Sequence, residues 1–401
     1  MRDYEFYYTQ DGSIGLYSHA DNDVYHSKFG ALTEAWEKFI LPLNIDENMS
    51  ISGTLNVLDV CYGIGYNTKA LMSYVLNHNE KFLRKKSFFE KLKIFIKNFS
   101  NKTRFLNNNI ATIDDDNINQ EKSELLLSDE TIEEGLATHF NIDCLDINED
   151  LIKFSPLLKT VITPQEIFTR IVPKIFSCFD TYWKIKKFLS KYSLKIAPRN
   201  KKSINELLDL KFDNEYETMD NEYKIHKFVN YIILNSLIKH YKNNYINKEF
   251  KKKMCERTNR PFFDKSLINY ARFYQNFRYN LLDKLNLIAI LHNIYYRHLS
   301  LRYKKLDFDK SCALFNLHFY PNDARKTVIK LDKQYDYIFL DAFTFSKAPE
   351  LWTVEFIAEL YKRLSPRGIL VTYSNSALVR NTFIENNFYI VLTTIFIFNI
   401  F

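Results

Sequence analysis

The 401-residue sequence contains few glycines, prolines and cysteines, with 8, 9 and 5 of each. So few glycines and prolines exclude collagen-like and linker-dominated chains. The cysteines form no Cys-x-x-Cys pair, so we predict neither a zinc knuckle nor a redox dithiol and expect a reducing cytosol. No stretch approaches the roughly 18–20 apolar residues of a membrane span, and the N-terminal MRDYEFYYTQDG lacks the basic flank and apolar core of a signal peptide. These absences predict a cytoplasmic protein without a membrane partner.

Apolar and aromatic residues are plentiful, at 46% and 16%, which excludes wholesale disorder. The length suits two or three domains, or one domain with large insertions. The 55 basic and 48 acidic residues leave a net charge of +7. The basic residues crowd into 81–102, 184–202, 239–253 and 297–305. Such runs indicate either solvated helix faces or a surface that follows nucleic-acid phosphates.

Strand and helix patterns alternate in three blocks. Residues 55–76 turn from an apolar run through glycines into a helical pattern, and a second strand is expected at 139–145. The third block begins at Ala313 and includes a strand, YDYIFLDAF, followed by a helix and another strand. This alternation predicts the α/β class, with a parallel sheet covered by helices on both faces.

Two segments interrupt these blocks. Residues 77–136 are rich in Lys and Asn and then acidic, without a clear strand, while 160–305 show helical periodicity. We interpret both as mostly helical insertions into one α/β domain. The domain would comprise 1–76, which holds the glycine loop, 137–159, which holds the second strand, and 306–401.

The string VLDVCYGIGYN, Val57–Asn67, is the motif that indicates a ligand-binding loop. A buried strand ends near Asp59, and Gly63 and Gly65 let the backbone approach a ligand before a helix N-terminus. A dinucleotide site would need a third glycine, but position 68 is Thr68. The short loop with its acid suits S-adenosylmethionine, which has an ammonium and a carboxylate to bind. An ordinary glycine-containing turn is the alternative.

Acidic residues follow the other strands. Asp146 could accept the ribose hydroxyls of a nucleoside, with Asp143 as a rival and a plain surface acid as the alternative. Asp323 could bind an adenine amino group, although Asn322 makes a simple turn equally possible. Asp341 ends the strand YDYIFLD, and in an open α/β sheet such strand ends meet at one crevice. We therefore expect Asp341 near the glycine loop.

Four motifs occur in the order typical of one known family: DVYHSKFGALTEA, VLDVCYGIGYN, LDAFTFSKAPELWT and TYSNSALVRNTFIENNF. The sequence resembles the methyltransferase part of the MnmC-type tRNA wobble-uridine modification enzymes, except in 77–136 and most of 160–305. The resemblance implies a class I, Rossmann-like S-adenosylmethionine-dependent methyltransferase sheet with largely helical insertions. It also implies methyl transfer to the aminomethyl group of wobble 5-aminomethyl-(2-thio)uridine in the tRNA anticodon loop. Nothing suggests the flavin-dependent oxidase part of bifunctional relatives.

The same resemblance assigns roles to residues. Asp341 would be the catalytic group that faces the reacting amine, and Tyr25 would line the pocket. The cofactor would contact Asp59, Tyr62, Gly63, Gly65, Asn67, Asp146 and Asp323. The reaction needs in-line positioning and a proton acceptor but no metal.

The RNA would require further contacts. Residues 292–305 offer Tyr295 and Arg297 for stacking and phosphate binding, or form a helix whose tyrosines pack inward. Lys347 and Arg380 are further candidate phosphate or substrate contacts. Two other functions stay open: a class I transferase acting on a small amine of the polyamine type, and a catalytically inactive RNA-binding relative.

The last residues depart from the family. The run FYIVLTTIFIFNIF, Phe388–Phe401, contains none of the residues that usually make a tight turn. We therefore predict that the final antiparallel hairpin of the sheet is missing or replaced. Such a sheet would expose an unpaired edge and an aggregation-prone tail.

Overall fold

The computed structural model describes the sheet region and one part of the long insertion. The described residues are 4–83, 138–161, 224–276, 306–392 and 396–399, without 21, 27–28, 44, 52 and 258–261. Predictions about Tyr295, Arg297 and most of 77–136 concern residues outside this described part.

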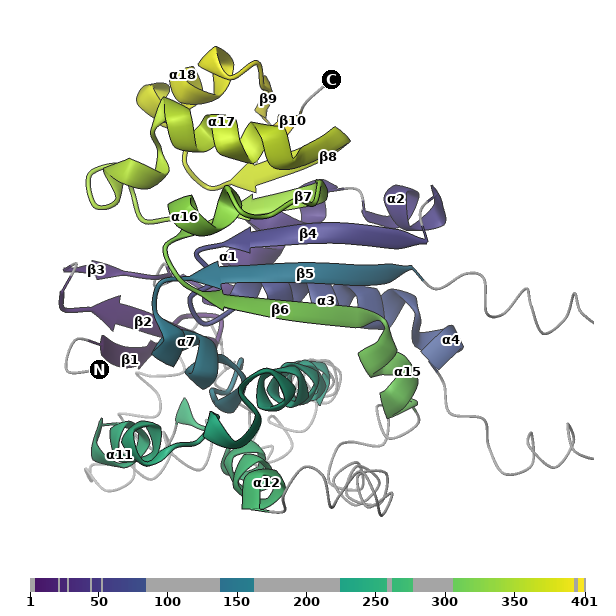
Figure 1. Ribbon diagram of the computed structural model, residues 1–401, viewed down its shortest axis with the longest axis vertical. Helices are drawn as coiled ribbons and strands as arrows, with labels where there is room; N and C mark the ends of the chain where they lie inside the picture. Colours follow the sequence, from purple (N-terminus) through teal and green to yellow (C-terminus); the bar gives the residue numbers. More distant parts are fainter. Residues whose placement is uncertain are drawn as a thin grey trace, which may run out of the picture.

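The described residues are built around one seven-stranded sheet (Figure 1). Its strands are β4 (Thr54–Val60), β5 (His139–Asp146), β6 (Phe315–Pro321), β7 (Tyr335–Leu340), β8 (Leu364–Thr372), β9 (Tyr389–Leu392) and β10 (Phe396–Asn399). They lie in the order β6-β5-β4-β7-β8-β10-β9. The first five run parallel, and β10 is antiparallel to both of its neighbours. The predicted α/β class with a parallel sheet is confirmed.

Alternating side chains give the sheet two apolar faces. Val57 and Phe339 share one apolar cluster with α1 (Ala31–Ala35) and α3 (Tyr66–His78). Leu58 and Leu340 share a second cluster with α16 (Ala324–Val328), α17 (Val354–Arg363) and α18 (Ala377–Glu385). Because helices cover both faces, a ligand finds room beyond the carboxyl ends of the strands.

Side-chain caps determine where several helices begin. Thr353 accepts a hydrogen bond from the Phe356 amide ahead of α17, and Ser376 accepts one from Val379 ahead of α18. Asn148 caps α7 (Glu149–Phe154) in the same way. Shorter helical segments are α2 (Ile45–Ile51), α4 (Glu80–Leu83), α15 (Phe308–Ala313), a π-helical turn (Trp36–Ile40) and 3₁₀ turns at Leu41–Leu43, Ser155–Leu157, Lys242–Asn244 and Pro349–Leu351.

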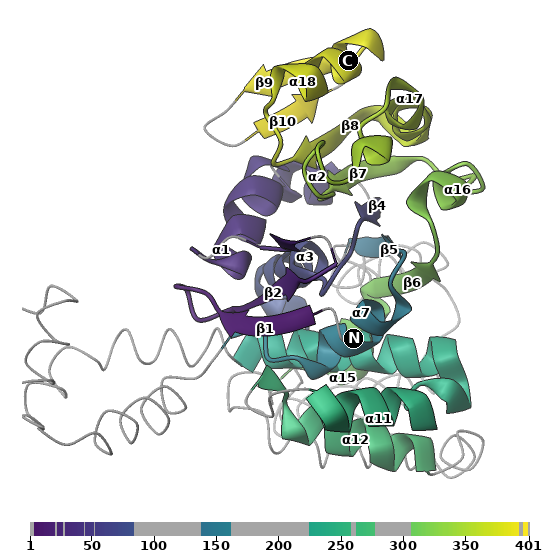
Figure 2. The same ribbon diagram turned by 90° about the vertical axis from the view of Figure 1, so that its left-hand side faces the viewer.

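A small antiparallel sheet precedes the main one. Its strands are β1 (Tyr4–Tyr8), β2 (Ile14–Ser18) and β3 (Asp23–Val24). It lies on the side of the main sheet where β4 and β5 end (Figures 1 and 2). The Tyr66 hydroxyl accepts a hydrogen bond from the Ile14 amide at 2.8 Å, which joins β2 to the start of α3.

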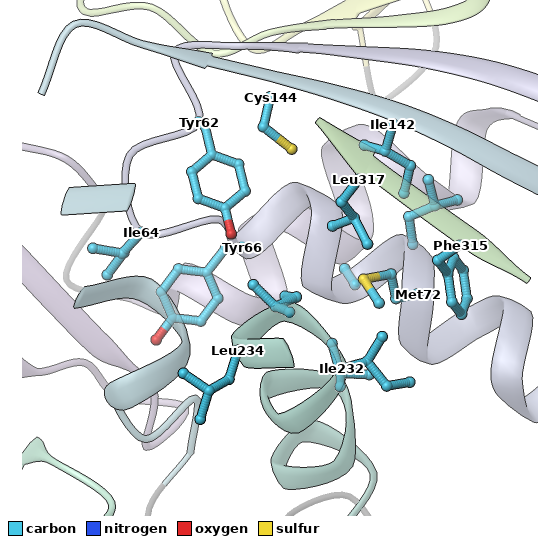
Figure 3. Packing of buried hydrophobic residues seen from close by; sticks show 14 of the residues in the cluster. Tyr62, Ile64, Tyr66, Met72, Ile142, Cys144, Ile232, Leu234, Phe315 and Leu317 are labelled. Carbon is cyan, nitrogen blue, oxygen red and sulfur yellow. The ribbon is translucent and has the colours of Figure 1, made fainter. Parts of the chain in front are cut away.

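The described part of the long insertion is helical. Residues 224–241 form a helix, followed by α11 (Lys248–Arg257) and α12 (Lys265–Asn276). Ile232 and Leu234 lie in the same apolar cluster as Met72 of α3 (Figure 3), so these helices extend the core of the sheet domain. Every helix in the described part of the chain is too short or too polar to span a bilayer. The boundaries 77–136 and 160–305 stay a prediction.

The prediction of a missing C-terminal hairpin is wrong. β9 and β10 pair antiparallel, with Phe396 opposite Leu392, and β10 also pairs with β8, with Ile397 opposite Val371. Only three residues separate the two strands, and hairpin loops of that length are common. The absence of turn-forming residues misled the prediction, because hydrogen bonds to the edge of β8 and β-branched, aromatic side chains favour the strands.

Candidate functional site

A glycine loop joins β4 to α3 at the carboxyl edge of the sheet. Gly63 and Gly65 have φ values of 55° and 77°, in the left-handed region that favours glycine. The Gly63 amide donates to Asp146 Oδ2 at 2.6 Å, and the Asn148 amide donates to Oδ1 at 2.7 Å. The loop is therefore tied to the end of β5.

A cavity of about 570 Å³ opens beside this loop. Its lining includes residues of β1, β3, α1 and α16 and residues at the ends of β4, β5, β7 and β8. The lining contains more carboxylates than cations. The acids are Asp23, Glu34, Asp146, Asp323, Asp341 and Glu350, and the bases other than His26 are Arg325 and Lys347. Such a lining favours a cationic group, such as a sulfonium or an ammonium.

Asp341 lies at this cavity, directly after β7. Asn67 Nδ2 donates to Asp341 Oδ2 at 2.9 Å, so the carboxylate is held by the first turn of α3. Burial raises the pKa of Asp341 to about 7, and the neighbouring charge of Glu34 acts in the same direction. A carboxyl group with this pKa can exchange a proton with an amine near neutral pH.

Glu34 and Tyr373 belong to the same wall, and sequence reasoning missed both as site residues. Glu34 forms an ion pair with Lys38, whose Nζ lies 5.7 Å from the centre of the Tyr373 ring. The Tyr373 hydroxyl donates to the Ala342 carbonyl at 2.8 Å. Glu34 lies within the motif DVYHSKFGALTEA. Because this motif is one of the four that resemble the family, it was the only feature of the sequence from which Glu34 could have been predicted as a site residue.

Asp146 and its rival Asp143 are in different surroundings. Asp146 lines the cavity, and burial raises its pKa to about 6, although its two amide hydrogen bonds act in the opposite direction. Asp143 instead accepts hydrogen bonds from the Tyr335 hydroxyl at 2.5 Å and from Lys333 Nζ at 3.0 Å. The geometry therefore favours Asp146 for a ligand and a structural role for Asp143.

Asp59 and Tyr62 lie behind the cavity wall. The Thr68 hydroxyl donates to Asp59 Oδ2 at 2.6 Å, while Oδ1 is buried without a partner among the described residues. Burial raises the pKa of Asp59 to about 7, and the charge of Asp146 adds to the effect. Tyr62 points into the apolar cluster (Figure 3), where its hydroxyl lies 2.9 Å from Ser155 Oγ.

The other predicted site residues are spread around this edge. Asp323 lines the cavity and caps α16, and it pairs with Arg325 at 2.7 Å, which lowers its pKa. Tyr25 and Lys347 also line the cavity. Arg380 is a half-buried residue of α18 outside the cavity lining. Tyr295 and Arg297 lie outside the described residues.

The residues fit S-adenosylmethionine in four respects. The cavity has the size of a small-molecule site. Asp146 has accepted one hydrogen bond on each oxygen, so each oxygen can accept another from a ribose hydroxyl. Asp59 Oδ1 is a buried acceptor that still lacks a donor. The loop glycines and Asn67 surround the uncapped N-terminus of α3, which suits the methionine carboxylate.

Comparisons with known proteins show what this chain is similar to. Residues 287–396 match the model of a family described as S-adenosyl-L-methionine-dependent methyltransferase. An uncharacterized protein of Methanocaldococcus jannaschii is 38% identical over 86 residues, which are 21% of this chain and 22% of that protein. A tRNA 5-methylaminomethyl-2-thiouridine biosynthesis bifunctional protein MnmC, from Pseudomonas savastanoi pv. phaseolicola, is 34% identical over 80 residues, or 20% of this chain and 12% of that protein. The MnmC2 structure from Aquifex aeolicus covers 99% of this chain and 69% of its own at 15% identity, with a TM-score of 0.42.

The fold and the matched family model define a class I methyltransferase domain whose cofactor is S-adenosylmethionine. The predicted fold class and cofactor are thereby confirmed. The matched family model and the local matches to MnmC proteins support the resemblance of the four motifs to MnmC-type methyltransferase domains. The matches span about a fifth of the Methanocaldococcus protein and about an eighth of the Pseudomonas protein. Matches this short do not show that this chain shares the substrate or partners of either relative.

Proposed function

We propose that the protein transfers the methyl group of S-adenosylmethionine to the aminomethyl group of wobble 5-aminomethyl-(2-thio)uridine in tRNA. The observation that carries the proposal is Asp341, a half-buried residue whose carboxyl is held by Asn67 at an acidic cavity next to the glycine loop. A tRNA substrate also agrees with the cytoplasmic location expected from the sequence.

The residues around the amine have distinct tasks in this proposal. Asp341 takes the proton of the incoming ammonium, because its pKa of about 7 balances the two protonation states near neutral pH. Glu34, which lines the same cavity, stabilises the positive charge that develops on the amine. Tyr25 and Phe343, with ring centres 4.7 Å apart, line the cavity where the base enters.

The cofactor would be held by the opposite side of the same cavity. Asp146 would accept the ribose hydroxyls, and the loop at Gly63 and Gly65 would take the methionine end, with Asp59 behind it. Asp323 is the candidate for the adenine amino group. When bound, the cofactor supplies an electrophilic methyl carbon, so positioning of a neutral amine is what the protein must add.

The identity of the amine rests on the relatives. Several matched Pseudomonas proteins are tRNA 5-methylaminomethyl-2-thiouridine biosynthesis bifunctional proteins, one of which is 40% identical over 58 residues. An amine on a wobble uridine supplies the single cationic group that the acidic lining favours. A uridine also supplies an aromatic face for Tyr25 and Phe343 to contact.

A small free amine of the polyamine type is the second candidate. The excess of carboxylates over cations at the cavity favours it, because a tRNA brings its own negative charge. Tight, salt-sensitive binding of tRNA would separate the wobble base from the free amine.

The test is to incubate the protein with S-adenosylmethionine and tRNA that contains 5-aminomethyl-2-thiouridine, and to measure wobble nucleosides by mass spectrometry. We expect a gain of one methyl group on that nucleoside. Methylation of a polyamine but not of the tRNA would select the second candidate. Absence of S-adenosylmethionine binding in calorimetry would instead indicate an inactive RNA-binding relative.

A further inference from the structure

Helix α11 has one face that is firmly packed. Phe250 is buried against Phe154 of α7, with ring centres 4.6 Å apart. Lys253 Nζ lies 2.8 Å from Asp150 Oδ2 and 3.0 Å from Glu249 Oε1. These contacts fix how the helix is turned relative to α7.

Three lysines are exposed on the side of α11 away from these contacts. Lys248, Lys251 and Lys252 are exposed. Because Lys251 and Lys252 follow Lys248 by three and four positions, the three side chains lie on one face of the helix and form a stripe. Glu249, which could have neutralised this stripe, is engaged by Lys253. Within the described part of the chain, neither Lys248 nor Lys251 forms an ion pair. The stripe is therefore a local excess of positive charge.

Helix α11, which carries the stripe, packs on α7 close to the cavity. Asp146, Ile147 and Asn148 line the cavity, and Asp150, two residues further along, binds Lys253 of α11. Figures 1 and 2 show α11 beside α7 on the side of the sheet where β4 and β5 end. A polyanion on α11 would thus be held next to the cavity opening.

We propose that the exposed lysine face of α11 binds the phosphate backbone of the RNA whose modified base enters the cavity. This proposal rests on the function proposed above and assigns a role to one part of the insertion. The cavity itself is acidic and repels phosphate, so a separate basic surface must supply the attraction. An anionic membrane fits less well, because Phe250 and Met254, the large apolar residues of α11, are buried.

The test replaces the three charges by neutral side chains of similar size, as Lys248→Gln, Lys251→Gln and Lys252→Gln in one protein. We measure the Kd for tRNA at several salt concentrations, together with S-adenosylmethionine affinity and the thermal midpoint. The slope of log K against log salt should fall in magnitude by about 2, at roughly 0.7–0.9 per lost phosphate contact. Cofactor affinity and the thermal midpoint should not change.

A matched control removes three exposed charges at the opposite end of the strands: Lys330→Gln, Lys362→Gln and Arg367→Gln. This control should keep the parental tRNA affinity and salt slope. The docking proposal fails if the α11 variant and the control have the same slope, or if the α11 variant loses binding to anionic vesicles while its tRNA affinity stays parental.

The two proposals can fail separately. A parent protein that binds tRNA through α11 but never methylates it would refute the proposed function and keep the docking surface. A parent that methylates tRNA equally well with and without the three lysines, at low tRNA concentration, would keep the function and refute the docking surface.

Discussion

Lys69 is expected to destabilise the fold at neutral pH, and its replacement by methionine should therefore be stabilising. The side chain lies in α3 and is only 1% exposed. Its Nζ donates to the Ser155 carbonyl at 2.8 Å and lies 5.5 Å from the centre of the Tyr66 ring. No carboxylate of the described residues forms an ion pair with it. Burial alone lowers the pKa of Lys69 from 10.5 to about 7.

The magnitude follows from this difference in pKa. A lowering of about 3.5 corresponds to roughly 4–5 kcal/mol of destabilisation when the amine is charged in both states. Methionine has a similar length and no charge, but it leaves the Ser155 carbonyl without its donor, which costs about 1–2 kcal/mol. We therefore expect Lys69→Met to raise the free energy of unfolding by about 2–4 kcal/mol at pH 7.

The sign of the pH dependence gives a sharper test. Between pH 7 and 10.5 the unfolded chain keeps the proton on Lys69 while the folded protein loses it, so the parent gains stability as the pH rises. The advantage of Lys69→Met should consequently shrink by about 2 kcal/mol between pH 7 and pH 9. Urea unfolding of both proteins at pH 6, 7, 8 and 9 measures this difference.

The exposed Lys330 provides the control, since Lys330→Met should change stability by less than about 0.5 kcal/mol at every pH. A Lys69→Met protein that is less stable than the parent at pH 7, or an advantage that does not depend on pH, would show that the amine is compensated by an anion or by water. Burial of Lys69 would then not destabilise the folded protein.

Three further predictions concern the site. Asp341→Asn should keep S-adenosylmethionine affinity in calorimetry but lower methyl transfer by roughly 10²- to 10⁴-fold, because the proton acceptor is lost; near-parental turnover at saturating tRNA would contradict its role. The parental rate should rise about tenfold per pH unit up to pH 7 and then level off, as the Asp341 carboxyl loses its proton; a rate that is flat from pH 5 to 8 would exclude this group as the base. Gly65→Ala should lower the thermal midpoint and the cofactor affinity much more than Gly12→Ala. Both positions have φ near 78°, but only at Gly65 would a Cβ lie 2.4 Å from the Tyr62 ring. Equal effects of the two substitutions would mean that the ring moves aside.

The sheet could be predicted from the sequence because its strands carry local signals. The runs around Val57 and Ile338 are continuous and apolar, as expected for strands buried on both faces, and each is followed by an acid or a glycine loop. The C-terminal strands lacked such signals. Their pairing depends on the edge of β8, which is a property of the folded sheet.

The site residues could be predicted from the sequence only in part, for a related reason. Asp146 and Asp341 could be predicted, because strand-end acids meet at one edge in any parallel sheet. Glu34 and Tyr373 reach the cavity from α1 and from the residue after β8, and no spacing in the sequence brings them together. The orientation of Tyr62 toward Ser155 likewise depends on packing, which decides whether a loop side chain faces the ligand or the core.

The long separations between neighbouring strands have a consequence for folding. Tyr337 on β7 pairs with Ile369 on β8, only about 32 residues later, whereas Ile142 on β5 pairs with Leu317 on β6 about 175 residues later. Because closure entropy grows only with the logarithm of length, the longer connection costs roughly 1.5 kcal/mol more. The same separation slows the search for native pairing, so the β7–α17–β8 unit should nucleate the sheet and β6 should join late. Large inserted segments therefore lower the equilibrium stability of this domain only slightly, and their main effect is to slow its folding.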